Sequence, residues 1–279
     1  MQRAISTHFF VNHRLTTALL DRVQRCGISL VEVFCAMQHL DYRNKAQVAE
    51  LGHWFRDSDM QLWSVHAPMH TDDVWGRSGP SSVINICERD KGRRIQAVDE
   101  IKRAIEIAED VPFKYLVQHI GVASEEFDEH KIDSAFSSFD ELTVFAKQRG
   151  VEILVENIPN GFSTAQRLLW FFAETHLHLC VCFDTGHAHI AGGVASEFEL
   201  LKDRIRSTHV HDNNGKDDKH IVPFVGEGGT IDWAKVMPLL RSQPDPFPLL
   251  LELKDTPETK HPLEDVVRSF EALENIPHE

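Results

Sequence analysis

Short apolar runs alternate with longer amphipathic segments along the whole chain. In residues 93–109, the apolar side chains Ile95, Val98, Ile101 and Ile105 recur at three- and four-residue steps, which predicts an amphipathic helix. Similar helical patterns occupy residues 133–149, 168–175 and 262–274. The runs between such patterns predict eight strands, at residues 4–10, 29–34, 61–66, 115–119, 151–156, 178–184, 205–211 and 249–253.

This alternation predicts the fold class. Eight strands in 279 residues give about 35 residues per repeat, the size of one strand and one helix. Eight such repeats suggest a parallel sheet closed into a single α/β (βα)8 barrel over residues 1–279, with its active site at the C-terminal ends of the strands. The polar segment 69–92 is predicted to be a long loop at that end of the barrel.

Metal-competent side chains stand where the later apolar runs stop. A carboxylate such as Glu156 or Glu252, inside a run of Leu, Ile and Val, carries a large desolvation cost unless a cation pairs with it. One histidine at a strand end is more often structural, but six strand ends of the same chemistry indicate a shared divalent-metal site. These ends carry His66, His119, Glu156, Asp184, His209 and Glu252.

The stretch Ser207–Thr230 is the richest in such side chains. It begins as a strand-like run, breaks at the turn-forming residues 212–215, and then continues as a polar loop. A metal-binding loop is one interpretation, and a hydrated polar loop is the other. Its candidate ligands are His209, His211, Asp212, Asp217, Asp218 and His220.

Composition limits the partners. A formal net charge of -14 repels a phosphate backbone, so nucleic acid is an unlikely partner. The basic cluster at residues 89–94 is more typical of a solvated helix start. Five cysteines without disulfide-module spacing indicate free thiols. Without a signal peptide or a long apolar run, we expect a cytoplasmic protein that does not enter membranes.

Several short strings between His66 and Glu252 resemble one known superfamily. HAP, QHIG, VENIPN, FDTGHAH, HVHDNNGKDDKH, GEG and LELK are similar to motifs of the xylose-isomerase-like TIM barrels. That superfamily contains sugar and sugar-phosphate isomerases and epimerases, inosose-processing enzymes, and the endonuclease IV type of nuclease (AP endonuclease family 2). The resemblance is therefore fairly specific for the superfamily and much less specific for the substrate.

The resemblance also implies roles for individual residues. In its single-metal epimerases, one divalent ion (Mn, Mg, Co or Zn) is held by residues that match Glu156, Asp184, His209 and Glu252. His211 is the rival of His209, and the family pattern favours His209. Further residues match either substrate-binding positions or the additional ligands of the nuclease's three-ion cluster: His66, His119, His187, Asp218 and His220.

The expected activity is isomerisation or epimerisation of a small-molecule sugar, sugar phosphate or cyclic polyol. Glu156 and Glu252 would exchange protons with the substrate while the ion stabilises an enediolate. Trp75 and Phe224, in loops at the mouth, are candidates for an apolar wall against the sugar ring. No partner for His8 can be seen in the sequence.

Two alternatives stay open. One is a phosphodiesterase like endonuclease IV, with a trinuclear zinc site, which the number of ligand types favours and the net charge opposes. The other is a noncatalytic sugar- or metal-binding barrel. A homodimer is expected only from the resemblance.

Overall fold

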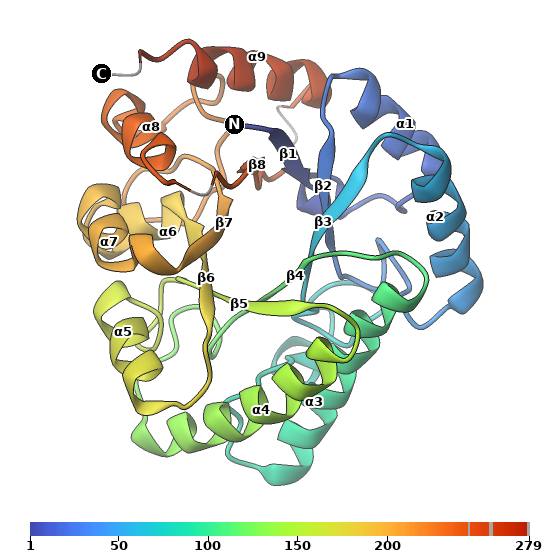
Figure 1. The fold of residues 1–279 in the computed structure, drawn as a ribbon, viewed down its shortest axis with the longest axis vertical. Helices are drawn as coiled ribbons and strands as arrows, with labels where there is room; N and C mark the ends of the chain where they lie inside the picture. Colours follow the sequence, from blue (N-terminus) through green and yellow to red (C-terminus); the bar gives the residue numbers. More distant parts are fainter. Residues whose placement is uncertain (245, 257–258, 278–279) are drawn as a thin grey trace.

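Eight parallel strands form a ring with helices around its outside in the computed structural model, which describes residues 1–244, 246–256 and 259–277 (Figure 1). Along the sheet their order is β7-β6-β5-β4-β3-β2-β1-β8. The predicted (βα)8 barrel is therefore confirmed. The strands are β1 (Arg3–Ser6), β2 (Leu30–Phe34), β3 (Gln61–His66), β4 (Tyr115–Gln118), β5 (Glu152–Glu156), β6 (Cys180–Asp184), β7 (Ile205–His209) and β8 (Leu249–Leu251).

In the part of the chain that is described, β7 and β8 meet through one isolated bridge, between Val210 and Leu251. The Val210 N–H donates to the Leu250 carbonyl (2.8 Å), and the Glu252 N–H donates to the Val210 carbonyl (3.2 Å). The ring thus closes directly beside His209 and Glu252.

The strongest helical patterns of the sequence correspond to α3, α4, α5 and α9. For the other helices, the eightfold repeat predicted their presence but not their bounds; α1, for example, is a short helix that buries Leu20 and Val23. The helices are α1 (Thr17–Arg25), α2 (Lys45–Asp57), α3 (Lys91–Ile105), α4 (Glu129–Lys147), α5 (Ala165–Glu174), α6 (Thr185–Ala191), α7 (Val194–Leu201), α8 (Trp233–Arg241) and α9 (Pro262–Glu274). Among the described residues, none is long and apolar enough to cross a membrane.

The core has two parts, one on each side of the strands. Outward side chains such as Val65 and Phe183 pack against the helices. Inward side chains fill the barrel below the strand ends, where Trp63 lies against two inner clusters and its Nε1–H donates to Ser207 Oγ (3.1 Å). This filled interior is the floor on which the polar strand ends stand.

Two β-bulges set which way the upper residues of β3 and β7 point. The register with the neighbouring strand shifts by one residue at Trp63 on β3 and at Arg206 on β7. A one-residue shift exchanges the two faces of a strand. Leu62 lies in the outer core, yet His66, an even number of residues later, faces the interior because of this shift. The bulge on β7 does the same for His209.

Some predicted boundaries were wrong. The first strand does not reach residue 10: it ends at Ser6, whose hydroxyl accepts the His8 N–H (3.3 Å) and starts the 3-10 helix η1 (Thr7–Phe10). The seventh strand ends at His209 instead of residue 211. The segment 69–92 is a loop, as predicted, up to the start of α3, and it contains the 3-10 helix η2 (Gly79–Ser82).

Candidate metal centre

Strand alternation explains why polar side chains meet above the floor. Side chains two positions apart on a strand share a face. Five inward polar residues therefore stand one step above an apolar residue of the inner clusters. These pairs are Leu30 and Glu32, Val117 and His119, Leu154 and Glu156, Cys182 and Asp184, and Leu250 and Glu252.

A first group, which we call group A, consists of Glu156, Asp184, His209 and Glu252. Their candidate ligand atoms all lie within 4.8 Å of one another, and all four residues are buried. His209 Nδ1 lies 3.3 Å from both Glu156 Oε1 and Glu252 Oε2. Asp184 Oδ1 accepts the His187 N–H (2.6 Å), whereas Asp184 Oδ2 has no hydrogen-bond partner among the described residues. A buried, unpaired carboxylate oxygen beside an unpaired imidazole nitrogen fits a divalent cation.

Group B consists of His66, His119 and Glu156. Glu156 belongs to both groups because its second oxygen, Oε2, lies 3.0 Å from His119 Nε2 and 3.4 Å from His66 Nε2. Glu156 therefore has one oxygen for each group.

Group C consists of His187, His211, Asp218 and His220. Asp218 Oδ2 lies 3.2 Å from Nε2 of both His187 and His220. The structure thus places His209 in group A and its rival His211 in group C. Gly186 leaves the space for His211, since a Cβ atom there would lie 2.0 Å from the His211 ring.

The remaining acids of the loop after β7 belong to none of the three groups. Asp212 organises the loop itself: Oδ1 accepts the N–H groups of Thr230 (2.9 Å) and Ile231 (3.0 Å), and Oδ2 accepts Trp233 Nε1–H (2.7 Å). Asp217 is exposed and contacts Asn214. Of the candidate acids in this loop, only Asp218 is directed toward the strand ends.

Protons stabilise the buried charges when no cation is bound. Burial alone would raise the pKa of Glu156, but His209 and His119 hold it well below its usual value. Burial would lower the pKa of His209, but the carboxylates around it, including Glu252, raise it well above its usual value. In group C, burial lowers and the hydrogen bond to Asp218 raises the pKa of His220, to about 9. The buried carboxylates of these groups therefore carry negative charge that metal cations can neutralise.

A cavity of ≈ 200 Å³ opens above these groups. Its apolar wall includes Phe34 and Trp75, whose ring centroids lie 5.2 Å apart. Trp75 therefore lines the site, as its place in the mouth loop suggested. Phe224 does not line it: its side chain is 57% exposed and its backbone has a φ of 63°. Lys254 is the one lysine or arginine among the described residues that line this cavity.

Two residues near these groups, one histidine and one glutamate, were not predicted from the sequence. His8 follows β1 and lines the cavity; its Nδ1 is buried without a hydrogen-bond partner among the described residues. Burial, together with His220 and His66, holds the pKa of His8 well below its usual value, so the ring is neutral. Glu32 is fully buried on β2 and contacts His209. Its place inside the apolar run Leu30–Phe34 is the same signal that singled out Glu156 and Glu252.

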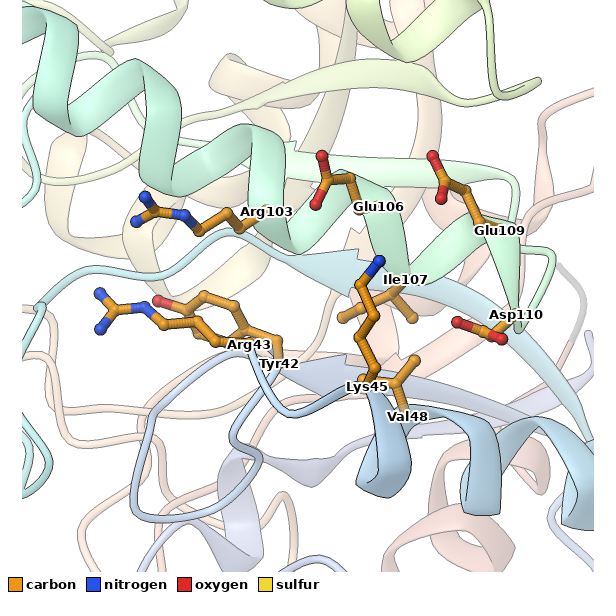
Figure 2. Close-up of a pocket in the computed structure, with 9 residues that line it drawn as sticks. All are labelled: Tyr42, Arg43, Lys45, Val48, Arg103, Glu106, Ile107, Glu109 and Asp110. Atoms are coloured by element: carbon orange, nitrogen blue, oxygen red, sulfur yellow. The ribbon is translucent and has the colours of Figure 1, made fainter.

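A larger cavity of ≈ 450 Å³ lies outside the barrel, between α2 and α3. Figure 2 shows Arg43 and Arg103 at one side of it and Glu109 and Asp110 at the other. Several of its charged groups are already paired: Arg43 and Arg103 both contact the buried Glu100, and Arg149 contacts Glu109. Size alone therefore does not select the candidate site, which we place where the ligand atoms of groups A, B and C converge.

Comparisons with known proteins show the family and the fold of the chain. A family model described as xylose isomerase-like TIM barrel matches residues 20–276. The chain is similar in structure to a D-tagatose 3-epimerase-like protein, with a TM-score of 0.77 and 24% identity over 99% of this chain and 97% of that one. This likeness shows the fold.

Two relatives in sequence have different descriptions. The uncharacterized protein MJ1311 of Methanocaldococcus jannaschii is 28% identical over 253 residues, 86% of this chain and 80% of its own length. A probable endonuclease 4 of Natronomonas pharaonis is 26% identical over 166 residues, 53% of this chain and 59% of its own length.

Proposed function

Because the chain belongs to the xylose isomerase-like TIM barrel family, we propose that it is a divalent-metal-dependent isomerase or epimerase of a sugar or sugar phosphate. The observation that carries the proposal is group A. Two glutamates, Glu156 from β5 and Glu252 from the end of β8, lie in one buried ligand set with Asp184 and His209 and line a cavity of ≈ 200 Å³. A cavity of this size suits a small polyol better than a polymer.

Three carboxylates and one imidazole would hold Mn²⁺, Mg²⁺, Co²⁺ or Zn²⁺. When bound, such an ion would supply Lewis-acid stabilisation of the negative charge that develops when a ketose loses the proton next to its carbonyl.

The chain's own residues supply the proton transfers. Glu156 and Glu252 come from different parts of the ring. One glutamate, as a carboxylate, would therefore remove the proton from the carbon next to the carbonyl, and the other, in its protonated form, would donate its own proton to that carbon from another direction. Phe34 and Trp75 provide the apolar wall for the sugar ring. The neutral imidazole of His8 binds a hydroxyl group.

Lys254 provides a candidate contact for an anionic substituent. It lines the same cavity as the carboxylates of Glu156, Asp218 and Glu252. A phosphate on the sugar would meet its ammonium group, which favours a phosphorylated over a neutral substrate.

A second candidate is hydrolysis of a phosphoester at a trinuclear site. Groups B and C favour it because, with group A, they offer ligands for three ions, and several ions together activate water and stabilise a leaving oxygen. The net charge of -14 and the small cavity speak against DNA as its substrate.

Two measurements on the purified protein separate these functions. Metal content per chain is measured by mass spectrometry, and deuterium uptake from solvent into a panel of ketoses and ketose phosphates is followed by NMR. We expect uptake at a ketose carbon, and a loss of about 10³-fold or more in Glu156→Gln, together with reduced metal content. Glu197→Gln, a buried carboxylate away from the site, should change neither.

The opposite results are equally clear. Full turnover and full metal content in Glu156→Gln would refute the role of group A. Three tightly bound ions, no deuterium uptake and cleavage of phosphoesters would establish the second candidate instead.

A further inference from the structure

Glu32 is a fully buried carboxylate that lies outside the three ligand groups. Its Oε2 accepts hydrogen bonds from His209 Nε2 (3.1 Å) and Ser64 Oγ (2.8 Å), and its Oε1 has no hydrogen-bond partner among the described residues. Among the described residues, no lysine or arginine forms an ion pair with Glu32. A buried carboxylate costs several kcal/mol unless it is compensated, so His209 is its main compensation.

The two nitrogens of His209 face in opposite directions. Nε2 donates to Glu32, while Nδ1 faces Glu156 Oε1 and Glu252 Oε2 at 3.3 Å each and makes no hydrogen bond within the described part of the chain. The imidazole of His209 therefore lies between the buried carboxylate of Glu32 on one side and the other ligand atoms of group A on the other. A carboxylate on the distal nitrogen of a ligating histidine fixes its tautomer and ring plane and raises its basicity.

From this geometry we infer that Glu32 is a positioning residue for the metal ion: it keeps the remaining proton of His209 on Nε2 and directs the Nδ1 lone pair into group A. The inference rests on the metal-binding half of the proposed function and not on the reaction catalysed. It also explains the bulge on β3, because the register pairs Glu32 with Ser64, whose hydroxyl then holds the same carboxylate oxygen.

The competing explanation is an ordinary buried ion pair. In that case His209 would carry protons on both nitrogens, and its positive charge would occupy the place of the cation. The two explanations differ in the number of protons on His209 when metal is present, which can be measured.

The first test compares the affinity for Mn²⁺, an ion that suits the carboxylate-rich group A better than the histidine-rich groups. Free Mn²⁺ is titrated by electron paramagnetic resonance in wild type, Glu32→Gln and Glu197→Gln. We expect Glu32→Gln to bind Mn²⁺ about 10- to 100-fold more weakly and Glu197→Gln to match wild type. A folded Glu32→Gln protein with wild-type affinity would overturn the inference and leave the proposed function standing.

The second test needs no variant at position 32. In wild-type protein loaded with Zn²⁺, a ¹⁵N-histidine NMR spectrum reports which nitrogen of His209 carries a proton, and His209→Asn assigns the signals. One proton, on Nε2, is expected. Protons on both nitrogens, or a proton on Nδ1 alone, would overturn the inference even if Glu32→Gln did not fold. A wild-type protein that takes up neither Mn²⁺ nor Zn²⁺ would overturn the inference and the proposed function together.

Discussion

His211 and His220 stack face to face, with ring centroids 3.9 Å apart and an angle of 13° between the ring planes. Two imidazolium ions at this separation would repel each other, so one positive charge is the most this stack accommodates without cost. We assign the charge to His220, because its Nε2–H donates a hydrogen bond to Asp218 Oδ2 (3.2 Å).

This charge predicts how the metal-free protein responds to pH. The pKa of His220 is raised to about 9, above the ordinary value of 6.5 that it regains on unfolding. Its contribution to stability is therefore fully present below pH 6.5 and is lost as the pH rises through 9. Urea unfolding in the presence of a chelator should show the free energy of unfolding falling by up to about 3 kcal/mol between pH 6.5 and 9.5.

Metal should reverse that trend. A ligating histidine must be neutral, so the affinity for the ion should rise over the same pH range. His66, His187 and His209, whose pKa values are also raised, add losses of the same sign to the share from His220. The pKa values of His8 and His119, in contrast, are lowered, and their effects fall below pH 6.5. Equal stability of the chelated protein at pH 6.5 and 9.5 would show that His220 is not charged in the folded state.

The aromatic wall can be tested with a matched pair of variants. Trp75 lines the cavity, whereas Phe224 is exposed and lies outside it. On a sugar that supports deuterium uptake, Trp75→Ala should raise KM about tenfold, equivalent to about 1.4 kcal/mol, because the ring loses its apolar contact. Phe224→Ala should change KM less than about twofold by the same reasoning. Similar effects of both variants would mean that the wall extends beyond the cavity described.

Lys254 should distinguish phosphorylated from neutral substrates. Lys254→Met keeps most of the side-chain volume but removes the ammonium group. For a ketose phosphate, we expect KM to rise about 10- to 100-fold, the value of a hydrogen bond to a charged group. For the unphosphorylated ketose, KM should stay unchanged. Steady-state kinetics on the pair decides the question, and an equal loss on both sugars would remove the phosphate from the proposal.

The sequence predicted the barrel because the alternation of apolar runs and amphipathic segments is a local pattern. It singled out Glu156, Asp184 and Glu252 for a similar reason: each stands where an apolar run stops, which is also a local pattern. The inward direction of His66 and His209, in contrast, depends on the bulges at Trp63 and Arg206. Simple alternation contains no signal for a bulge, so these histidines were placed by their position at strand ends.

The residues that were missed depend on contacts between distant parts of the chain. His8 becomes a lining residue because Ser6 ends β1 and η1 turns the chain over the barrel mouth. Glu32 has a partner that lies 177 positions away in the sequence. Phe224 was assigned to the mouth from its loop alone, and the sequence did not show that this side chain faces solvent.

Across residues 1–244, 246–256 and 259–277, the junction of β7 and β8 has one bridge, at Val210, and so the least backbone support in the ring. His209 and Glu252 flank that junction from opposite sides, so an ion ligated by both would link the two strands across it. Metal loading would then govern how often the barrel opens, and chelation should accelerate hydrogen–deuterium exchange at the Val210 and Glu252 amides more than at the paired amides of β4 and β5.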